Sequence, residues 1–206
     1  MTRTFERFAA VAAIAVGFGA IFYAALFVAI VEGAGVTTGK LWFFTLMVGA
    51  IATVPVITAL FLLLRDVDQG FALTAFVLGL GAALGGVMHG AYNLGAKVTP
   101  PAEGVAGPNE EAVSHGVLRY LIAGLFFLLV AWLVTRSDRL PRALGYVAAL
   151  AGAALVFIYI GRLYDFITPG DYVSLIPPLV YGFVLHPLWY GWLGLLLWRG
   201  LTPMRA

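Results

Sequence analysis

The sequence predicts an all-α, polytopic membrane protein with six transmembrane helices in three antiparallel hairpins. Of its 206 residues, 62% are hydrophobic and 11% are charged, whereas soluble domains carry about a quarter charged residues. The mean hydropathy of +0.99 agrees with lipid as the main solvent. Six apolar runs are each long enough to cross a hydrocarbon core of about 30 Å at about 1.5 Å per residue. An even number of spans places both termini on one side.

The spans follow from the apolar runs in chain order. The first run is longer than the apolar region of a signal peptide, which has about 7–15 residues, so it is interpreted as a membrane anchor. Short polar turns or longer loops separate the others. The predicted spans cover residues 8–31, 41–64, 71–93, 113–135, 143–166 and 175–198 of a single domain, 1–206.

The distribution of basic residues predicts the orientation. Arginine and lysine are retained on the cytoplasmic face. The loops at 32–40, 94–112 and 167–174 contain only Lys40 and Lys97. The termini and the other two turns hold Arg3, Arg7, Arg65, Arg136, Arg139, Arg142, Arg199 and Arg205. We therefore expect a multi-pass protein of the cell membrane with both termini cytoplasmic. The basic residues form no single patch, which argues against nucleic acid as a partner.

Small residues and prolines predict how the helices pack. Glycine or alanine recurs every four residues in several spans, as in Ala9/Ala13/Gly17 and Ala82/Gly86/Gly90, and such rows let helix backbones approach closely in lipid. The run GLGAALGG follows no predicted strand, so it does not indicate a phosphate-binding turn. Pro55 and Pro187 lie inside spans, where each removes a helical hydrogen bond and is expected to kink its helix.

Polar and ionisable groups from four helices mark a candidate site in the outer half of the membrane. Glu111, His115 and Arg119 recur every four residues and form one stripe of the fourth helix. Polar groups inside a bilayer usually face the bundle interior, where they pair or serve a pathway. Arg119 lies well inside its span and is expected to need a carboxylate partner, for which Glu32, Glu111 and Asp165 are the candidates.

The sixth helix adds an aromatic face. In FVLHPLWYGW, helical spacing places Gly182, His186 and Tyr190 together, with Trp189 and Trp192 beside them. A polar mouth that narrows into an aromatic throat would suit a ligand with a polar head and an apolar body. The candidate ligand-binding residues are His89, Tyr92, Asn93, His115, Arg119, Arg162, Asp165, His186, Trp189 and Tyr190.

Catalytic and metal-binding motifs are not found. The sequence has no cysteine and no HExxH pair, so a zinc site would need His89, His115 and Glu111 to meet between two helices. Haem could be held by His89 and His115 if they faced each other at one depth. Neither cofactor is expected. Ser114 and His115 point about 100° apart on a helix and cannot form a nucleophile–base pair directly.

The C-terminal half contains the segments RSDRLPRALGYVAALAGAAL and LVYGFVLHPLWYGWLGLLLWRG. In these segments the chain resembles bacterial six-helix membrane proteins that are grouped as domains of unknown function. The resemblance covers the last three helices. It implies a bacterial inner-membrane protein of the predicted topology, and it implies no activity or site residue.

Three hypotheses of function follow. The first is a non-catalytic binding or accessory protein with an outward-facing, aromatic-lined pocket for a lipid-like or amphipathic molecule; a membrane protein or a second copy of the chain could be its partner. The second is a transporter of small solutes or ions. It requires polar residues to continue toward the cytoplasm, where the spans offer mainly Thr45, Thr53, Thr58 and Thr74. The third is a metal- or haem-dependent membrane enzyme.

Overall fold

The computed structural model describes residues 1–99, 109–164 and 172–200, with the backbone alone at 109–117 and 172–175. Within these ranges the chain is helical and forms no strand. Six helices are long and apolar enough to cross a membrane, the last of them running through α6, η1 and α7. The elements are α1 (Arg3–Val31), α2 (Val36–Leu64), α3 (Gln69–Val98), α4 (Asn109–Arg136), α5 (Arg142–Leu163), α6 (Tyr172–Val180), the π-helical η1 (Tyr181–Leu185) and α7 (His186–Arg199).

Several helices differ in length from the predicted spans. α3 continues past the predicted end at Asn93 and stops at Val98. Its extension holds no helix breaker until Pro100, and the residue before a proline avoids the helical conformation. α2 begins before the predicted start, at Val36, and α5 ends at Leu163, before residue 166. Hydropathy locates the membrane-crossing part of a helix, whereas local backbone chemistry decides where the helix ends.

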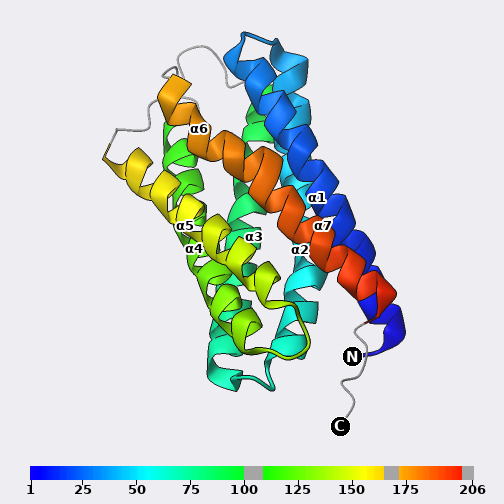
Figure 1. The fold of residues 1–206 in the computed structure, drawn as a ribbon. Helices are drawn as coiled ribbons and strands as arrows, with labels where there is room; N and C mark the ends of the chain where they lie inside the picture. Colours follow the sequence, from blue (N-terminus) through cyan, green and yellow to red (C-terminus); the bar gives the residue numbers. More distant parts are fainter. Residues whose placement is uncertain (100–108, 165–171, 201–206) are drawn as a thin grey trace.

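The helices form a ring in which neighbours in sequence are neighbours in space (Figure 1). α2 packs along α3, α4 along α5, and α7 along α1. The first two pairs are joined by short turns, whereas the pairing of α7 with α1 was not predicted from the sequence. α1–α2 and α3–α4 contacts complete most of the ring. The final seam is sparse, because α5 touches α6, η1 and α7 at few positions. The ring is therefore least tightly closed between the fifth helix and the last one.

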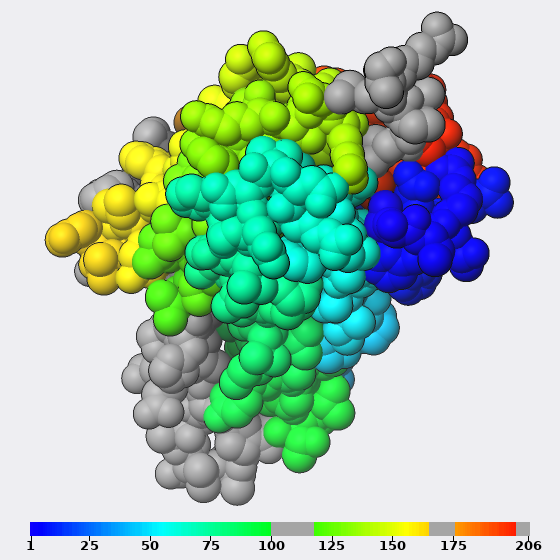
Figure 2. Space-filling view, turned by 90° about the horizontal axis from the view of Figure 1, so that it is seen from below, coloured from blue at the N-terminus to red at the C-terminus, as the bar shows by residue number. Residues whose placement is uncertain are grey.

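α1 begins and α7 ends at the same end of the bundle, as Figure 2 shows from below. The Arg3 guanidinium donates to the carbonyl oxygen of Trp198 at 3.0 Å. At this end Arg139 of the α4–α5 turn also bridges to Asp66 of the α2–α3 turn at 2.7 Å. At this end of the bundle lie all the described arginines from which the orientation was predicted.

Glycine lets the backbones of adjacent helices touch. A Cβ on Gly124 of α4 would lie 3.0 Å from the carbonyl oxygen of Gly152 in α5, and a Cβ on Gly152 would lie 2.9 Å from that of Gly124. In the same way Gly90 of α3 lies against the carbonyl of Phe43, and Gly17 of α1 against the carbonyl of Pro187. Close packing is therefore confirmed as the role of Gly17 and Gly90. The Gly124–Gly152 contact was not predicted.

The sixth span changes its helical type halfway. Residues Tyr181–Leu185 are π-helical, and the backbone N–H of His186 donates to the carbonyl of Tyr181, five residues earlier. Pro187 follows and has no N–H with which to hold a regular turn. The break predicted at Pro187 is thus a π-helical turn, a feature that frequently marks functional sites. α2, in contrast, is one α-helix that includes Pro55.

The half of the bundle near the termini is packed solid. Large apolar side chains from four helices are at most 1% exposed there: Leu64, Leu133, Leu144, Leu193 and Leu197. The outer surface is apolar as well, and the side chains of Phe18, Val77, Leu84, Met88 and Leu150 are each at least 60% exposed. Exposed apolar surface on this scale is unfavourable in water and fits contact with lipid chains.

Candidate functional site

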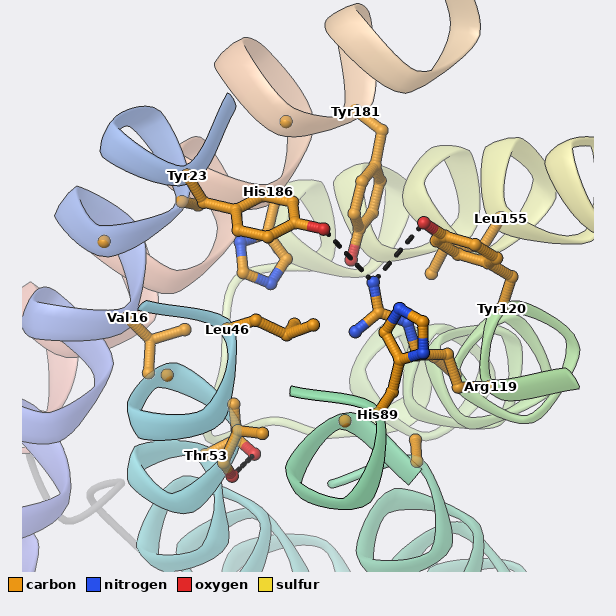
Figure 3. Close-up of a pocket in the computed structure, with 18 of the residues that line it drawn as sticks. Val16, Tyr23, Leu46, Thr53, His89, Arg119, Tyr120, Leu155, Tyr181 and His186 are labelled. Atoms are coloured by element: carbon orange, nitrogen blue, oxygen red, sulfur yellow. Dashed lines mark hydrogen bonds between the residues drawn. The ribbon is translucent and has the colours of Figure 1, made fainter. Parts of the chain in front are cut away.

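A cavity of about 440 Å³ lies in the half of the bundle away from the termini. Every helix of the bundle contributes to its wall, from Val16 of α1 to Tyr190 of α7 (Figure 3). Its volume falls in the range of about 300–1,000 Å³ that is usual for small-molecule pockets. The cavity takes in the apolar residues Ile57 and Phe127 toward the packed half and polar side chains toward the opposite end. It is therefore graded from apolar to polar along the bundle.

Arg119 is the central polar group of the cavity. Its Nη2 donates to the Tyr120 hydroxyl at 3.3 Å and to the Tyr23 hydroxyl at 3.5 Å, and its guanidinium carbon lies 4.9 Å from the Tyr120 ring centre. Gly85 and Gly86 of α3 lie next to this side chain: a Cβ on Gly85 would be 3.4 Å from Arg119 Cβ, and one on Gly86 would be 3.8 Å from Nη1, both ordinary van der Waals distances.

The described partners of Arg119 are hydroxyl groups, and of the three candidate carboxylates only Glu32 has a described side chain. Among the residues with described side chains, the hydrogen bonds of Arg119 go to tyrosine hydroxyls and it forms no ion pair. Glu32 is exposed at the C-terminal end of α1. Glu111 lies in the part of α4 whose side chains are not described, and Asp165 lies outside the described residues. Among the described side chains, the partners of Arg119 are therefore neutral and do not balance its positive charge.

Aromatic rings cover the α1–α2 side of the cavity. Trp42 stacks on Tyr23 with ring centres 5.2 Å apart and an angle of 25° between the planes. Phe27 and Phe43 contact the same indole at 5.7 and 4.7 Å. The indole Nε1 of Trp42 is buried and has no hydrogen-bond partner among the described groups. The stack holds Tyr23 at the position where its hydroxyl meets Arg119.

His89 and Asn93 form a polar pair on α3. The Asn93 side-chain amide donates to the His89 carbonyl at 2.8 Å and lies 3.3 Å from His89 Nδ1. The His89 ring meets Phe43 edge to face at 5.9 Å. Both residues line the cavity. The prediction that they share one site is in accord with this geometry.

The last helix supplies Tyr181, Gly182, His186 and Tyr190 to the cavity. The centre of the His186 ring lies 5.2 Å from the centre of the Tyr181 ring and 4.5 Å from the centre of the Tyr190 ring. Its Nδ1 is buried without a hydrogen-bond partner in the described part of the chain. Because the π-helical turn falls between Tyr181 and His186, it sets the angle at which these two side chains enter the cavity.

Several predicted site residues lie elsewhere. Trp189 is completely buried against Phe127 and Tyr190, at 5.0 and 4.8 Å between ring centres, and it does not line the cavity. Tyr92 is 54% exposed and is also absent from the wall. Arg162 does line it. The His115 side chain is not described, so the predicted stripe and the metal or haem pair with His89 fall outside the described residues.

Four aromatic residues of the wall that carry an O–H or N–H group, Tyr23, Trp42, Tyr120 and Tyr181, were missed. For Tyr23 a signal existed, because a tyrosine hydroxyl in the middle of an apolar span usually needs a partner in the bundle. Tyr120 follows Arg119 directly, and helix spacing gave no reason to expect adjacent residues to interact. The sequence does not show which face of each helix turns inward when all faces are apolar.

Together, the fold and the cavity define an all-helical bundle with six candidate membrane spans around a graded, partly polar pocket. Within the ranges that the structure describes, no group of three histidine, aspartate or glutamate side chains is placed to hold a metal ion. A scan against protein-family models and searches of curated proteins and solved structures find no match to the chain.

Proposed function

We propose that this protein is a non-catalytic, membrane-embedded binding or accessory protein whose cavity takes a lipid-like or amphipathic molecule. The observation that carries the proposal is the cavity of about 440 Å³ with an apolar floor and a polar cluster around Arg119 at its other end. Ligand pockets are generally lined by apolar and aromatic side chains with a few placed polar groups. A molecule with one polar end and one apolar end matches both parts.

The order of residues along α4 supports this match. Arg119 and Tyr120 are followed by Ala123 one turn later and by Phe126 and Phe127 after a further turn, and all five line the cavity. A ligand lying along α4 would therefore pass from a cationic group to apolar rings within about 10 Å of helix. Burial of an apolar chain contributes about 0.8 kcal/mol per CH₂ group relative to water.

The packed half of the bundle favours binding over transport. Beyond Ile57 and Leu155, the interior toward the termini consists of apolar side chains apart from Ser137, without comparable space in the described residues. The hydroxyls of Thr58 and Thr74 donate to carbonyl oxygens of their own helices at 3.0 and 2.9 Å. A polar solute would have to cross this region without the polar groups that a pathway supplies.

The proposal is tested by filling the cavity. Gly49 lines it, and a Cβ there meets nothing within 4 Å, so Gly49→Phe places a ring in the empty space. Gly191 offers equally open space but does not line the cavity, which makes Gly191→Phe the matched control. Mass spectrometry of purified protein should find a bound amphiphile with the wild type and with Gly191→Phe. Gly49→Phe should lose it.

Two results would contradict the proposal. One is purified wild type that neither retains an amphiphile nor binds one when a series of lipids and detergents is supplied. The other is undiminished retention by a folded Gly49→Phe variant, because the ligand would then lie outside the cavity.

The termini are proposed to face the cytoplasm, with the polar end of the cavity toward the outer side. The arginines at the end where α1 begins support this orientation. The natural sequence contains no cysteine, so single cysteines report their own side. Ala34→Cys and Asp138→Cys replace exposed residues at opposite ends of the bundle. A membrane-impermeant maleimide added to intact cells should label Ala34→Cys and not Asp138→Cys; the reverse pattern would invert the orientation.

A further inference from the structure

We propose that the ligand's polar end is an oxyanion, a carboxylate or a phosphate, bound by Arg119 together with the hydroxyls of Tyr23 and Tyr120. This inference rests on the proposed binding function and names the chemical class of its ligand. It excludes neutral amphiphiles such as alcohols as the preferred occupants.

The first argument is charge. The described lining of the cavity includes Arg119 and Arg162 and contains no aspartate or glutamate. A cationic side chain inside a membrane protein usually has a counter-charge nearby, because an uncompensated charge in a low-dielectric interior is costly. The described partners of Arg119 are neutral hydroxyls at 3.3 and 3.5 Å, longer than the 2.7–2.9 Å or so of charge-assisted hydrogen bonds. An anionic ligand would supply a counter-charge that the described lining lacks.

The second argument is the geometry of the donors. Both described hydrogen bonds of Arg119 use Nη2, so Nη1 and Nε make none among the described residues. A guanidinium presents its N–H groups as a planar fork that fits the two oxygens of a carboxylate or phosphate. The Tyr23 and Tyr120 hydroxyls accept from Arg119, which leaves each O–H free to donate to the same anion.

The third argument is an unpartnered polar group on another wall. His186 lies opposite Arg119 across the cavity in Figure 3, and its buried Nδ1 has no hydrogen-bond partner in the described chain. Buried polar atoms normally have partners, and an exception in a cavity wall calls for an unseen polar group. Arg119 and His186 therefore face one space from α4 and α7, and each has a polar atom without a partner among the described residues.

The experiment compares ligands that share one chain and differ in their heads. Delipidated wild type is titrated with hexadecanoic acid, hexadecyl phosphate and hexadecan-1-ol, and binding is read by native mass spectrometry and by displacement of a fluorescent fatty acid. We expect at least one of the two anions to bind about 10- to 100-fold more tightly than the alcohol, the range expected for hydrogen bonds to a charged group. Equal binding of all three, or tighter binding of the alcohol, would overturn the inference and leave the proposed function standing.

Two variants test whether Arg119 causes the preference for the anionic ligands. Arg119→Gln should reduce the affinity for the preferred anion about 10- to 100-fold and leave the affinity for the alcohol unchanged within about threefold. Arg136→Gln removes a positive charge from the same helix outside the cavity, where Arg136 stacks on Trp132 at 4.1 Å, and should change neither affinity. Equal losses with both variants would overturn the assignment to Arg119.

Two further results separate the possible failures. If Arg119→Gln does not fold, the comparison of heads with the wild type still decides the inference, and Tyr23→Phe keeps the ring while removing one hydroxyl. If inorganic phosphate competes as well as hexadecyl phosphate does, the proposal of an amphiphilic ligand is wrong and the site binds a free anion. If none of the three hexadecyl ligands binds, both the proposed function and this inference are wrong.

Discussion

The Nη2 atom of Arg119 lies 3.5 Å from the Tyr23 hydroxyl oxygen, and this contact joins α4 to α1 across the cavity. These two helices do not pack along each other. The side chains therefore meet only because the ring of helices encloses a space between them. This hydrogen bond helps to maintain the shape of the cavity. In the proposed complex, the ligand hydrogen-bonds to the same two side chains.

Tyr23→Phe tests the stabilising part of this contact. The change removes the hydroxyl and preserves the ring that stacks on Trp42. We expect the free energy of unfolding to fall by about 0.5–1.5 kcal/mol, because the hydrogen bond is long and polar contacts within membrane proteins are modest. Thermal unfolding in detergent measures the change. Tyr146→Phe, at a residue that is 62% exposed, is the control and should be neutral; an equal loss there would dismiss the contact as the cause.

Gly152→Ala should separate α4 from α5. The added Cβ would lie 2.9 Å from the carbonyl oxygen of Gly124 and 3.0 Å from the backbone nitrogen of Leu128, and neither atom can move without its helix. Overpacking of this kind costs about 1–3 kcal/mol. Gly95→Ala, where a Cβ meets nothing within 4 Å, should be neutral or slightly stabilising because alanine favours a helix. A stable Gly152→Ala with an unchanged unfolding temperature would contradict this packing.

Trp189→Ala should affect stability through the core. The indole is completely buried, and its ring contacts Phe127 and Tyr190. Removal of a buried large aromatic side chain costs about 3–5 kcal/mol. Tyr190→Phe is the comparison: it retains the ring and removes a hydroxyl from the cavity wall, so it should unfold near the wild-type temperature. If Trp189→Ala were as stable as the wild type, the placement of this side chain in the core would be wrong.

Deletion of Val184 tests the role of the π-helical turn. Val184 lies in η1 and is 52% exposed, and a π-helical turn holds about one residue more than an α-helical turn. Its deletion should convert η1 to α-helix with little loss of stability and weaken ligand binding, because Tyr181 and His186 would enter the cavity at altered angles. Deletion of Leu195 in the regular part of α7 is the control.

The control deletion rotates the rest of α7 by about 100° and should destabilise the protein strongly. Unfolding temperature and retention of the amphiphile are measured for both variants. Unchanged ligand binding without Val184 would show that the π-helical turn does not shape the site.

The sequence determined the number and type of the helices because the requirement that lipid imposes applies to each segment separately. Every backbone polar group in the membrane must be bonded within its own segment, so a long apolar run has to be a helix. The small-residue rows that contain Gly17 and Gly90 and the helix break near Pro187 followed from equally local chemistry. Arg119, His89, Asn93 and His186, which line the cavity, were also candidates from the sequence, because polar groups are rare in such runs.

Only the tertiary structure decided which groups share the cavity. The spans are apolar on nearly every side, so no hydrophobic stripe indicates which side turns inward. Trp189 and Tyr190 are adjacent in sequence and both are buried, yet only Tyr190 reaches the cavity wall. The partnership of Arg119 with Tyr23 depends on the closure of the ring of helices. Local chemistry determines each helix, whereas the rotation of each helix about its axis is determined by packing against its neighbours.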